Sequence, residues 1–420
     1  MIVSSQAKHS RPLLVLLSFL LLGVLTLSAC GGGSVDTTPV SPPNAALQAA
    51  LQQDVASYLS ERSTIEHISG VSVSISLRGS TSPIDVVAGT SQSGGSQPLT
   101  PSNVFQLGSQ TKAMTAIAIL QLEAAGKLSI TDPLSKWLPQ YPLWGSVTIK
   151  ELLNMTSGLP SYSSEDAFQL ALSSAPNTIW TTAQLIGFAY PAAPIFSPGA
   201  AFDYSNTNYI LAQMIVAAAS QGQAFDTVLQ AIIASAGMTS SSYSSTSYSS
   251  SVLQTMPAGY FANDAITDLH AFLNQSVTNY NLSWGQGAGA AVGTMDDLGK
   301  WARALYDGNL LPTAQHQELL SIVSTTTGQP ISTTTPNDPN GFGLGVVQDT
   351  DPTLGTYWNY LGTTLGFRTL YVWLPASDTV IAIGVNSQPP SGEDSLSSRT
   401  TNGRAIIKTL YATLHSYGKV

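Results

Sequence analysis

The sequence predicts a mixed α/β (α+β) protein in which helices flank one antiparallel sheet built from strands at both ends of the chain. Near the start, residues 71–77 alternate between apolar and polar side chains, the period of a strand with one buried face, and residues 84–88 follow as its partner strand. Near the end, residues 369–374 and 379–385 have the composition of two adjacent strands. The sequence between about 147 and 290 is rich in helical patterns and long loops. A mainly helical insertion is therefore expected between the two halves of the sheet.

Helix signals appear in four further segments. Residues 45–59 space Ala, Leu and Val as a helix does, and residues 113–125 are strongly apolar. Residues 294–305 open on Thr-Met-Asp-Asp, which resembles a capping box, and residues 404–414 predict a closing helix. Residues 240–251, almost entirely Ser, Tyr and Thr, predict an exposed loop. The expected domains are an α/β sheet domain, residues 45–146 and 291–420, and a mainly helical domain, residues 147–290.

The N-terminal residues have the pattern of an export signal. Lys8 and Arg11 form a basic start, and residues 13–27 are an apolar run that is too short to span a membrane but suits the core of a signal peptide. The following Leu27-Ser-Ala-Cys30 resembles a bacterial lipoprotein lipobox, which implies that an acylated Cys30 anchors the protein outside the cytoplasm on a bacterial membrane. The alternative is a plain secretory peptide cleaved after Ala29, which leaves an idle thiol. The expected segments are a lipoprotein signal peptide, residues 1–29, and a flexible tether, residues 30–44.

Composition excludes several classes of function. Charged residues make up 9% of the 420 residues, against about 25% in an average soluble domain. The formal net charge of −9 argues against a nucleic-acid partner, which would need a basic face. A single Cys allows no intramolecular disulfide, no Cys-rich zinc site and no iron–sulfur cluster, and we expect no metal or cofactor. A hydrophobic fraction of 43% is ordinary, so a polytopic membrane protein is also excluded.

The sequence gives little support to a serine–histidine–aspartate triad. It lacks the G-x-S-x-G turn of α/β-hydrolases and the H-E-x-x-H pair of metalloproteases. The histidines that follow the signal peptide are scattered, and each fits a surface or packing position better than a catalytic one. They are His67, His270, His316 and His415.

A serine activated by lysine is the better candidate. Ser109-x-x-Lys112 places both side chains on one face at the start of an apolar helix, whose N-terminal dipole favours an oxyanion. Burial beside that helix would lower the lysine pKa, so that the amine could accept a proton. Chance supplies about one such match in a chain this rich in serine, and Ser416-x-x-Lys419, four residues from the C-terminus, is that decoy.

A second motif, Tyr204-Ser-Asn206, is also common by itself, since Tyr357-Trp-Asn359 has the same form. The surroundings are more specific. The ordered segments are Asn103-Val-Phe-Gln-Leu-Gly-Ser-Gln-Thr-Lys112, Leu152-Leu-Asn-Met-Thr-Ser-Gly-Leu-Pro160, Phe196-Ser-Pro-Gly199, Tyr204-Ser-Asn-Thr-Asn-Tyr209 and Gly366-Phe367 before the strand at 369–374.

These segments resemble the motifs of the penicillin-recognising serine hydrolases, in the branch of class C β-lactamases, serine D-Ala-D-Ala carboxypeptidases and lactamase-like esterases. In order, they are similar to the first active-site motif, the interdomain signature, the Pro-Gly approach, the second motif and the third-motif strand. The resemblance runs from about Ser69 to the C-terminus. It implies a β-lactamase/transpeptidase-like fold.

The resemblance also implies roles for individual residues. Ser109 would be the nucleophile that forms an acyl-enzyme, and Tyr204 would be the general base, with a pKa depressed by Lys112. Asn206 would hydrogen-bond Lys112 and the substrate amide. The backbone N–H groups of Ser109 and Thr363 would form the oxyanion hole, each donor contributing about 3–4 kcal/mol to the transition state.

One motif departs from the family. The third motif normally reads K-T-G or H-x-G, and the aligned triplet here is Tyr360-Leu361-Gly362. A cation that could pair with a substrate carboxylate is replaced by a phenol at Tyr360, while Gly362 keeps the backbone open for close substrate approach. Arg368 either supplies a replacement charge or is an ordinary surface residue at the end of a strand.

The leading hypothesis is an extracytoplasmic serine hydrolase of the esterase or D-alanyl-D-alanine carboxypeptidase type, because the phenol at position 360 counts against a β-lactamase proper. Its partners would be a small acyl or peptide substrate and, through Cys30, the membrane, and it would act as a monomer. One alternative is a catalytically silent penicillin-binding-like envelope lipoprotein. A solute-binding lipoprotein fits the lipobox but does not explain the ordered motifs.

Overall fold

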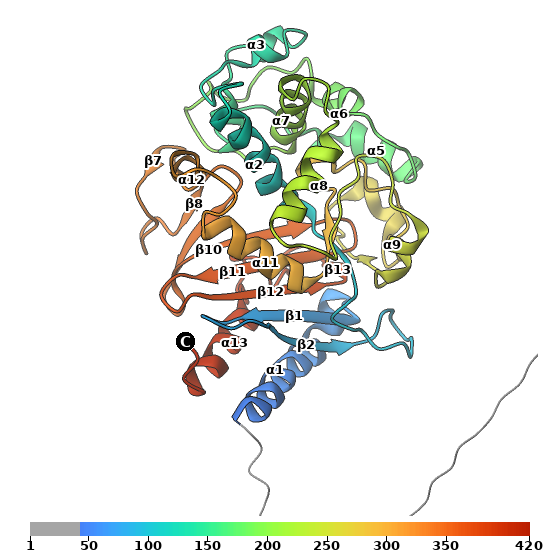
Figure 1. Ribbon diagram of the computed structural model, residues 1–420. Helices are drawn as coiled ribbons and strands as arrows, with labels where there is room; N and C mark the ends of the chain where they lie inside the picture. Colours follow the sequence, from blue (N-terminus) through green and yellow to red (C-terminus); the bar gives the residue numbers. More distant parts are fainter. Residues whose placement is uncertain (1–42) are drawn as a thin grey trace, which may run out of the picture. The chain divides into compact units, whose positions relative to one another are not determined.

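A nine-stranded antiparallel sheet lies at the centre of the computed structural model, which describes residues 43–420 (Figure 1). The strand order is β2-β1-β12-β11-β10-β9-β8-β6-β7. Strand β1 from the start of the chain pairs with β12 near its end, with Val73 opposite Ile383. The expected single sheet from both chain ends is therefore confirmed. The strands are β1 Gly70–Ser76, β2 Ile84–Gly89, β6 Ile322–Ser324, β7 Pro330–Ile331, β8 Asn340–Phe342, β9 Val347–Asp351, β10 Gly355–Thr363, β11 Arg368–Leu374 and β12 Thr379–Val385.

The predicted strand at 71–77 differs from expectation in one respect. Its apolar residues face a core shared with the terminal helices, but Ser72 and Ser74 on the opposite side are also buried, with 1% and 3% of their surface exposed. The reason is the helix α11 (Met295–Tyr306), which packs against β1 and β12 on that face. Both faces of this strand are covered, so polar residues in an alternating pattern did not mark solvent here.

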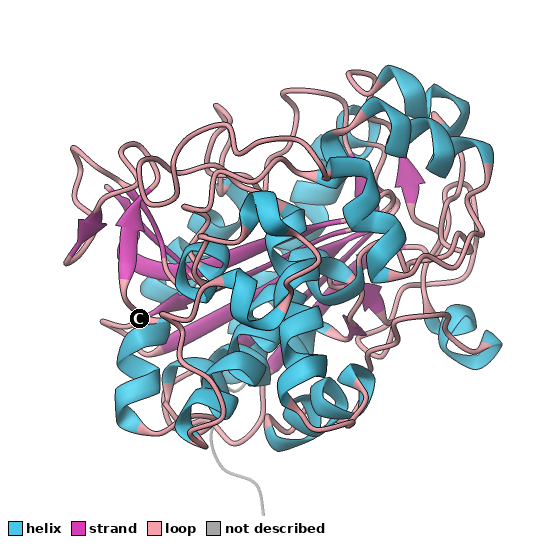
Figure 2. Cartoon of the chain, turned by 90° about the horizontal axis from the view of Figure 1, so that it is seen from above, coloured by secondary structure: helices cyan, strands magenta, loops and turns pink. Residues whose placement is uncertain are grey.

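Two helices cover the other face of the sheet (Figures 1 and 2). They are α1 (Pro43–Glu66) and α13 (Ala405–Ser416), which pack against each other. Apolar side chains of both, such as Leu51 and Leu410, join the sheet core. The first helix begins two residues earlier than the sequence predicts and continues past Leu59, so residues 43 and 44 are helical rather than tether. The proposed signal peptide, Cys30 and the rest of the tether lie outside the described residues.

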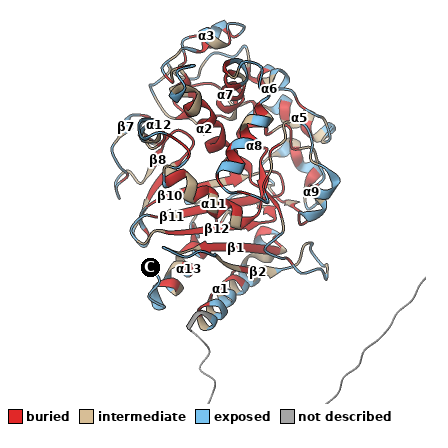
Figure 3. Ribbon diagram, viewed as in Figure 1, coloured by how far each residue is buried: buried red, intermediate tan, exposed pale blue. Residues whose placement is uncertain are grey.

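Most of the remaining regular structure is helical. Helix α2 packs against α7, α8 and α10, so the chain segment that bears Ser109 lies among the helices between 147 and 290. Figure 3 colours the buried residues of these helices red. The helices are α2 Thr111–Ala124, α3 Leu134–Trp137, α4 Ile149–Leu153, α5 Asp166–Ser174, α6 Thr182–Ala189, α7 Asn206–Ala219, α8 Phe225–Ser235, α9 Ser250–Thr255, α10 Gln286–Gly289 and α12 Thr313–Leu319. Two short strand pairs, β3 (Phe105–Gln106) with β5 (Val292–Gly293) and β4 (Tyr260–Phe261) with β13 (Ser387–Gln388), tie the parts together.

The serine-rich segment 240–251 is not the exposed loop that its composition predicts. Ser241 and Tyr243 are buried, and α9 already begins at Ser250. The Ser240 amide and the Ser241 hydroxyl donate to Asp297 Oδ2 at 2.6 and 2.9 Å. The hydroxyls of this segment are therefore partners of a buried carboxylate as well as surface groups.

Arg368 lies in a buried ion-pair cluster, which corrects both sequence interpretations of this residue. Its side chain is fully buried, and one guanidinium nitrogen lies 2.6 Å from Glu66 at the end of α1 and 2.7 Å from Asp394. Its Nε donates to the Ser387 carbonyl oxygen at 2.8 Å. The charge is thus neither a free group for a substrate nor a surface group. It joins α1, β11 and the loop after β13.

Within residues 43–420, no helix is both long enough and apolar enough to cross a bilayer.

Replacing Arg368 with methionine should destabilise the fold by about 3 kcal/mol, the lower end for a broken buried ion pair. The reason is that Asp394 would lose its partner while Glu66 would keep Arg62 at 2.6 Å. The measurement is the urea-unfolding midpoint of the soluble domain. The matched control is Arg78→Met, since the Arg78 guanidinium makes one hydrogen bond, to the Ala376 carbonyl, at an exposed site, and its loss should change stability by less than about 0.5 kcal/mol. Equal midpoints for the two variants would contradict the structural role of Arg368.

Candidate active site

The proposed nucleophile lies on a short turn that leads into a buried helix. Ser109 is in the 3-10 turn Gly108–Gln110, and α2 begins at Thr111. The turn starts with a positive φ of 55° at Gly108, a conformation that favours glycine. The Thr111 hydroxyl donates to the Gly108 carbonyl at 2.8 Å, which closes the turn. Ser109 is thereby held, half-buried, at the N-terminus of the helix.

Lys112 occupies the centre of the site. Its side chain is fully buried, and Nζ lies 3.0 Å from Ser109 Oγ, 2.7 Å from Asn206 Oδ1 and 2.8 Å from the Ala288 carbonyl oxygen. None of these partners is charged, and Lys112 forms no ion pair with the residues that the structure describes. Burial therefore lowers the pKa of Lys112 well below its ordinary value, as the apolar helix led us to expect.

Tyr204 also contacts the nucleophile, but its pKa moves opposite to the expected direction. Its hydroxyl donates to Ser109 Oγ at 2.9 Å and lies 3.4 Å from the Tyr360 hydroxyl. Although Tyr204 as a whole residue is 38% exposed, its hydroxyl lies against these two partners. Burial raises the pKa of Tyr204 to about 12, which outweighs the lowering effect of its hydrogen bonds with Ser109 and Tyr360. Tyr204 is thus a neutral hydrogen-bond donor in this arrangement, and Lys112 does not turn it into a phenolate.

The segment similar to the interdomain signature positions the loop that carries Tyr204. The Asp203 amide donates to the Met155 carbonyl at 3.0 Å, and the Thr207 hydroxyl donates to the Pro160 carbonyl at 2.7 Å. These bonds bracket Tyr204 on both sides. The signature residues therefore support the site without touching the nucleophile.

Asn206 is brought to Lys112, and its other side-chain atom is engaged. While Oδ1 accepts from Lys112, Nδ2 donates to Ser163 Oγ at 2.7 Å, and the Asn206 amide donates to Ser161 Oγ at 3.1 Å. Sequence reasoning missed both serines, because serine is too abundant in this chain to stand out. It also missed the Ala288 carbonyl, for which the Gly- and Ala-rich run 285–291 was the available signal.

The third-motif triplet lies on β10, and the strand that the sequence analysis took as the third-motif strand is its neighbour β11. A Cβ at Gly362 would lie 2.0 Å from the Leu107 carbonyl oxygen, so the glycine is needed where β10 packs against the residue before the Ser109 turn. The same approach brings Thr363 to the turn, since a Cβ on Gly108 would lie 2.7 Å from the Thr363 nitrogen. Tyr360 is buried, and burial raises its pKa well above the ordinary value, so it remains a neutral phenol.

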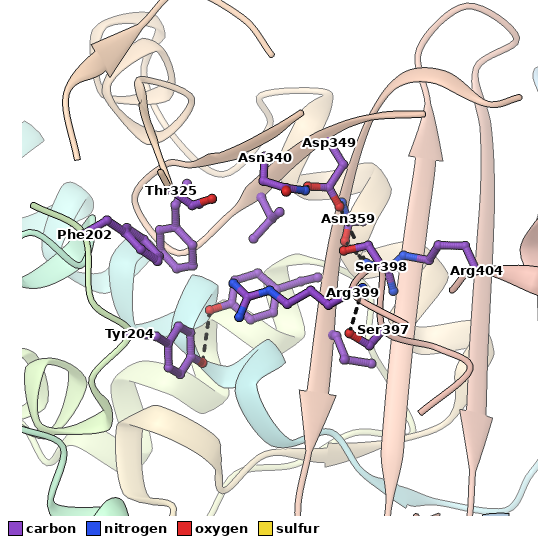
Figure 4. A pocket seen from close by; sticks show the side chains of 14 residues that line it. Phe202, Tyr204, Thr325, Asn340, Asp349, Asn359, Ser397, Ser398, Arg399 and Arg404 are labelled. Carbon is purple, nitrogen blue, oxygen red and sulfur yellow. Dashed lines mark hydrogen bonds and ion pairs between the residues drawn. The ribbon is translucent and has the colours of Figure 1, made fainter. Parts of the chain in front are cut away.

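A pocket of about 330 Å³ opens beside the pair of tyrosine hydroxyls (Figure 4). Phe202, Tyr204, Phe342 and Tyr360 form an aromatic wall, in which the Phe342 ring is 5.9 Å from that of Tyr360. The opposite side is polar and includes residues 397–399 of the loop after β13. Within residues 43–420, no cluster of three or more His, Cys, Asp or Glu side chains is arranged to hold a metal ion.

Comparisons with known proteins find a matching family model and several relatives. A family model described as Beta-lactamase matches residues 51–401. Penicillin-binding protein 4* of Bacillus subtilis is 28% identical over 284 residues, which is 66% of this chain and 59% of that protein. The putative penicillin-binding protein PbpX of the same organism is 27% identical over 69% of this chain and 63% of its own length. The chain thus spans about three fifths of the length of these relatives.

Among solved structures, a D-stereospecific amidohydrolase from Streptomyces sp. is 25% identical with a TM-score of 0.68, covering 81% of this chain and 94% of that one. A D-amino acid amidase from Ochrobactrum anthropi SV3 has a TM-score of 0.73 at 21% identity, over 88% of this chain and 99% of its own. The second comparison speaks for the fold alone.

Gly362→Ala should lower stability by about 1–3 kcal/mol, because the added methyl group would force β10 and the Ser109 turn apart. Chemical denaturation measures the effect. The control is Gly187→Ala, in an exposed turn of α6 with open space around the new methyl group, which should stabilise by about 0.5–1 kcal/mol. A Gly362→Ala variant as stable as the unaltered protein would show that the two backbones do not approach so closely.

Proposed function

Because the chain belongs to the β-lactamase family of serine hydrolases, we propose that it hydrolyses small acyl substrates through a covalent acyl-enzyme on Ser109. The observation that carries this proposal is the geometry around one oxygen. Ser109 Oγ lies 3.0 Å from a buried lysine amine and accepts a hydrogen bond of 2.9 Å from a tyrosine hydroxyl. The base and the acid are thus each within proton-transfer distance of the nucleophile.

In the proposed acylation step, Ser109 Oγ attacks the substrate carbonyl carbon and its proton passes to the neutral Lys112 amine. The negative charge moves to the carbonyl oxygen, which the N–H groups of Ser109 and Thr363 would stabilise together with the N-terminus of α2. When the tetrahedral intermediate collapses, the bond to the leaving group breaks. Tyr204 then donates its proton to the leaving group and regains one from protonated Lys112. Water next attacks the acyl-serine, which releases the acid and restores Ser109.

The assignment of Lys112 rather than Tyr204 as the base follows from the two pKa shifts. The lysine pKa is lowered, so its neutral form is accessible, whereas the tyrosine pKa is raised, so its anionic form is not. Tyr204 is accordingly the donor in the hydrogen bond to Ser109. In this assignment the neutral lysine amine accepts a proton and the neutral tyrosine hydroxyl donates one.

We propose esters or D-alanyl-D-alanine-type peptides as substrates, rather than β-lactams. The neutral Tyr360 supports the ester, because this residue offers no charge to the carboxylate that a β-lactam or a D-alanyl-D-alanine peptide carries. The similarity to a D-stereospecific amidohydrolase and to penicillin-binding protein 4* supports a substrate with a D-amino-acid or peptide component. Acylation of Cys30 would hold the enzyme at a membrane outside the cytoplasm. There it would act as a monomer.

Labelling with a fluorescent fluorophosphonate and a fluorescent penicillin tests the nucleophile. We expect an adduct on Ser109 that disappears in Ser109→Ala and forms about 10²–10⁴-fold more slowly in Lys112→Ala, the usual contribution of a general base. Lys419→Ala, in the decoy motif, should label normally. Absence of any adduct in the unaltered protein would refute the hydrolase and favour a silent binding protein with this fold.

The pH dependence of kcat/KM tests the base. Below its pKa, Lys112 is protonated and cannot accept the serine proton, so activity should rise as pH increases through a pKa that lies below the ordinary 10.5. Tyr204→Phe should lower activity but leave this acid limb at the same pH, which a p-nitrophenyl ester assay would show. If the rise instead vanished in Tyr204→Phe, the tyrosine would be the base.

A further inference from the structure

The loop that follows β13, residues 389–404, lines part of the pocket and is held in place by hydrogen bonds and an ion pair. Asp394 anchors it from within, because Oδ1 accepts from buried Arg368 at 2.7 Å and from the Leu396 amide at 3.0 Å. The Thr400 hydroxyl donates to the Asp394 carbonyl at 2.8 Å. The Arg399 amide donates to Ser397 Oγ at 3.2 Å. These bonds hold Arg399 on the side of the pocket that faces the aromatic wall.

Arg399 is unlike the other arginines of residues 43–420. The guanidinium groups of the others all contact other parts of the chain: Arg62, Arg303, Arg368 and Arg404 lie within 4.0 Å of a carboxylate, and Arg78 donates to the Ala376 carbonyl. Among the described residues, the Arg399 guanidinium has neither an ion pair nor a hydrogen bond. It is exposed, and Figure 4 shows it extending across the pocket in the direction of Tyr204.

The rest of the pocket offers no competing free charge. Arg404 also lines it, but its guanidinium donates to Asn359 Oδ1 at 2.6 Å and lies 3.7 Å from Asp349, which also accepts from Asn340 at 2.8 Å. The positive charge of Arg404 is thus paired with the negative charge of Asp349. Arg399 is therefore the one cation of the pocket lining, within the described chain, that has no carboxylate partner.

We infer that Arg399 is a specificity-determining residue that binds a carboxylate on the acyl substrate. The inference rests on the proposed acyl-serine chemistry and narrows its substrate class to acyl compounds with one carboxylate in the part that fills this pocket. A guanidinium presents two parallel N–H donors that match the two oxygens of a carboxylate. A single free cation balances the single charge of a carboxylate, whereas a phosphate dianion would need a second cation. The Arg399 side chain reaches toward Tyr204, which contacts Ser109, so the carboxylate would be bound close to the nucleophile. This arrangement would not need a cation at position 360.

The test compares two esters of N-acetylglycine that differ only in charge, the 3-carboxyphenyl and the 3-carbamoylphenyl ester, by kcat/KM. Arg399→Ala should lower the ratio of carboxyphenyl to carbamoylphenyl hydrolysis about tenfold, mainly through KM, and Arg399→Glu should lower it further. Arg399→Lys should recover part of the ratio, since it restores the charge without the planar fork. Added salt should reduce the ratio in the unaltered protein.

The matched control is Lys127→Ala, which removes one exposed positive charge at the opposite end of α2 from Ser109. Its ratio should equal that of the unaltered protein. If the unaltered protein cleaves both esters and Arg399→Ala and Arg399→Glu leave the ratio unchanged, the inference is overturned while the hydrolase stands. If the unaltered protein cleaves neither ester and neither probe labels Ser109, the proposed function fails first, and the assignment of Arg399 falls with it.

Discussion

A lysine amine buried without a carboxylate partner is the constraint on which the rest of the site depends. Its three contacts come from three places in the chain: Ser109 in the turn before α2, Asn206 at the start of α7 and the Ala288 carbonyl in α10. A buried amine that loses such partners is costly. The helices must therefore pack closely enough to supply all three oxygens. Burial without a counter-ion also lowers the lysine pKa. The need for close packing and the lowered pKa therefore have the same cause, the burial of an unpaired amine.

The sheet contributes a second constraint, the close approach of β10 to the Ser109 turn. The Gln110 side chain donates to the Tyr360 carbonyl at 2.7 Å, and Gly362 leaves no room for a side chain beside Leu107. These contacts place Tyr360 and Thr363 next to the nucleophile although they lie some 250 residues away in sequence. The contacts between β10 and the Ser109 turn thus fix the distance across the site. The helical part fixes the position of Lys112, and Ser109 lies where the two constraints meet.

Features that depend on residues close together in the sequence could be predicted, whereas features that depend on residues far apart could not. The Ser109–Lys112 contact follows from helix spacing, and β1, β2, β11 and β12 follow from local patterns. The strands β6 to β9 were missed because each is only two to five residues long, too short to show a clear period, and β10 was missed as well. Arg368 was misjudged because its partners, Glu66 and Asp394, belong to other elements. The pKa of Tyr204 was misjudged because enclosure of its hydroxyl depends on Tyr360, which only tertiary packing brings near.

Because the chain has few charged residues, the partners of each cation are informative about its role. With 15 basic residues in 420, most arginines of the described region tie distant segments together, as Arg368 does for α1 and the loop after β13. Lys112 and Arg399 lack carboxylate partners for opposite physical reasons. Burial without a counter-ion lowers the pKa of the lysine, so that its amine can accept a proton at a lower pH than an ordinary lysine can. Exposure lets the arginine keep its charge at little cost, and the anchored loop keeps that charge at the pocket. A cation left unpaired at a pocket is therefore more informative about function here than the motif position from which a cation is missing.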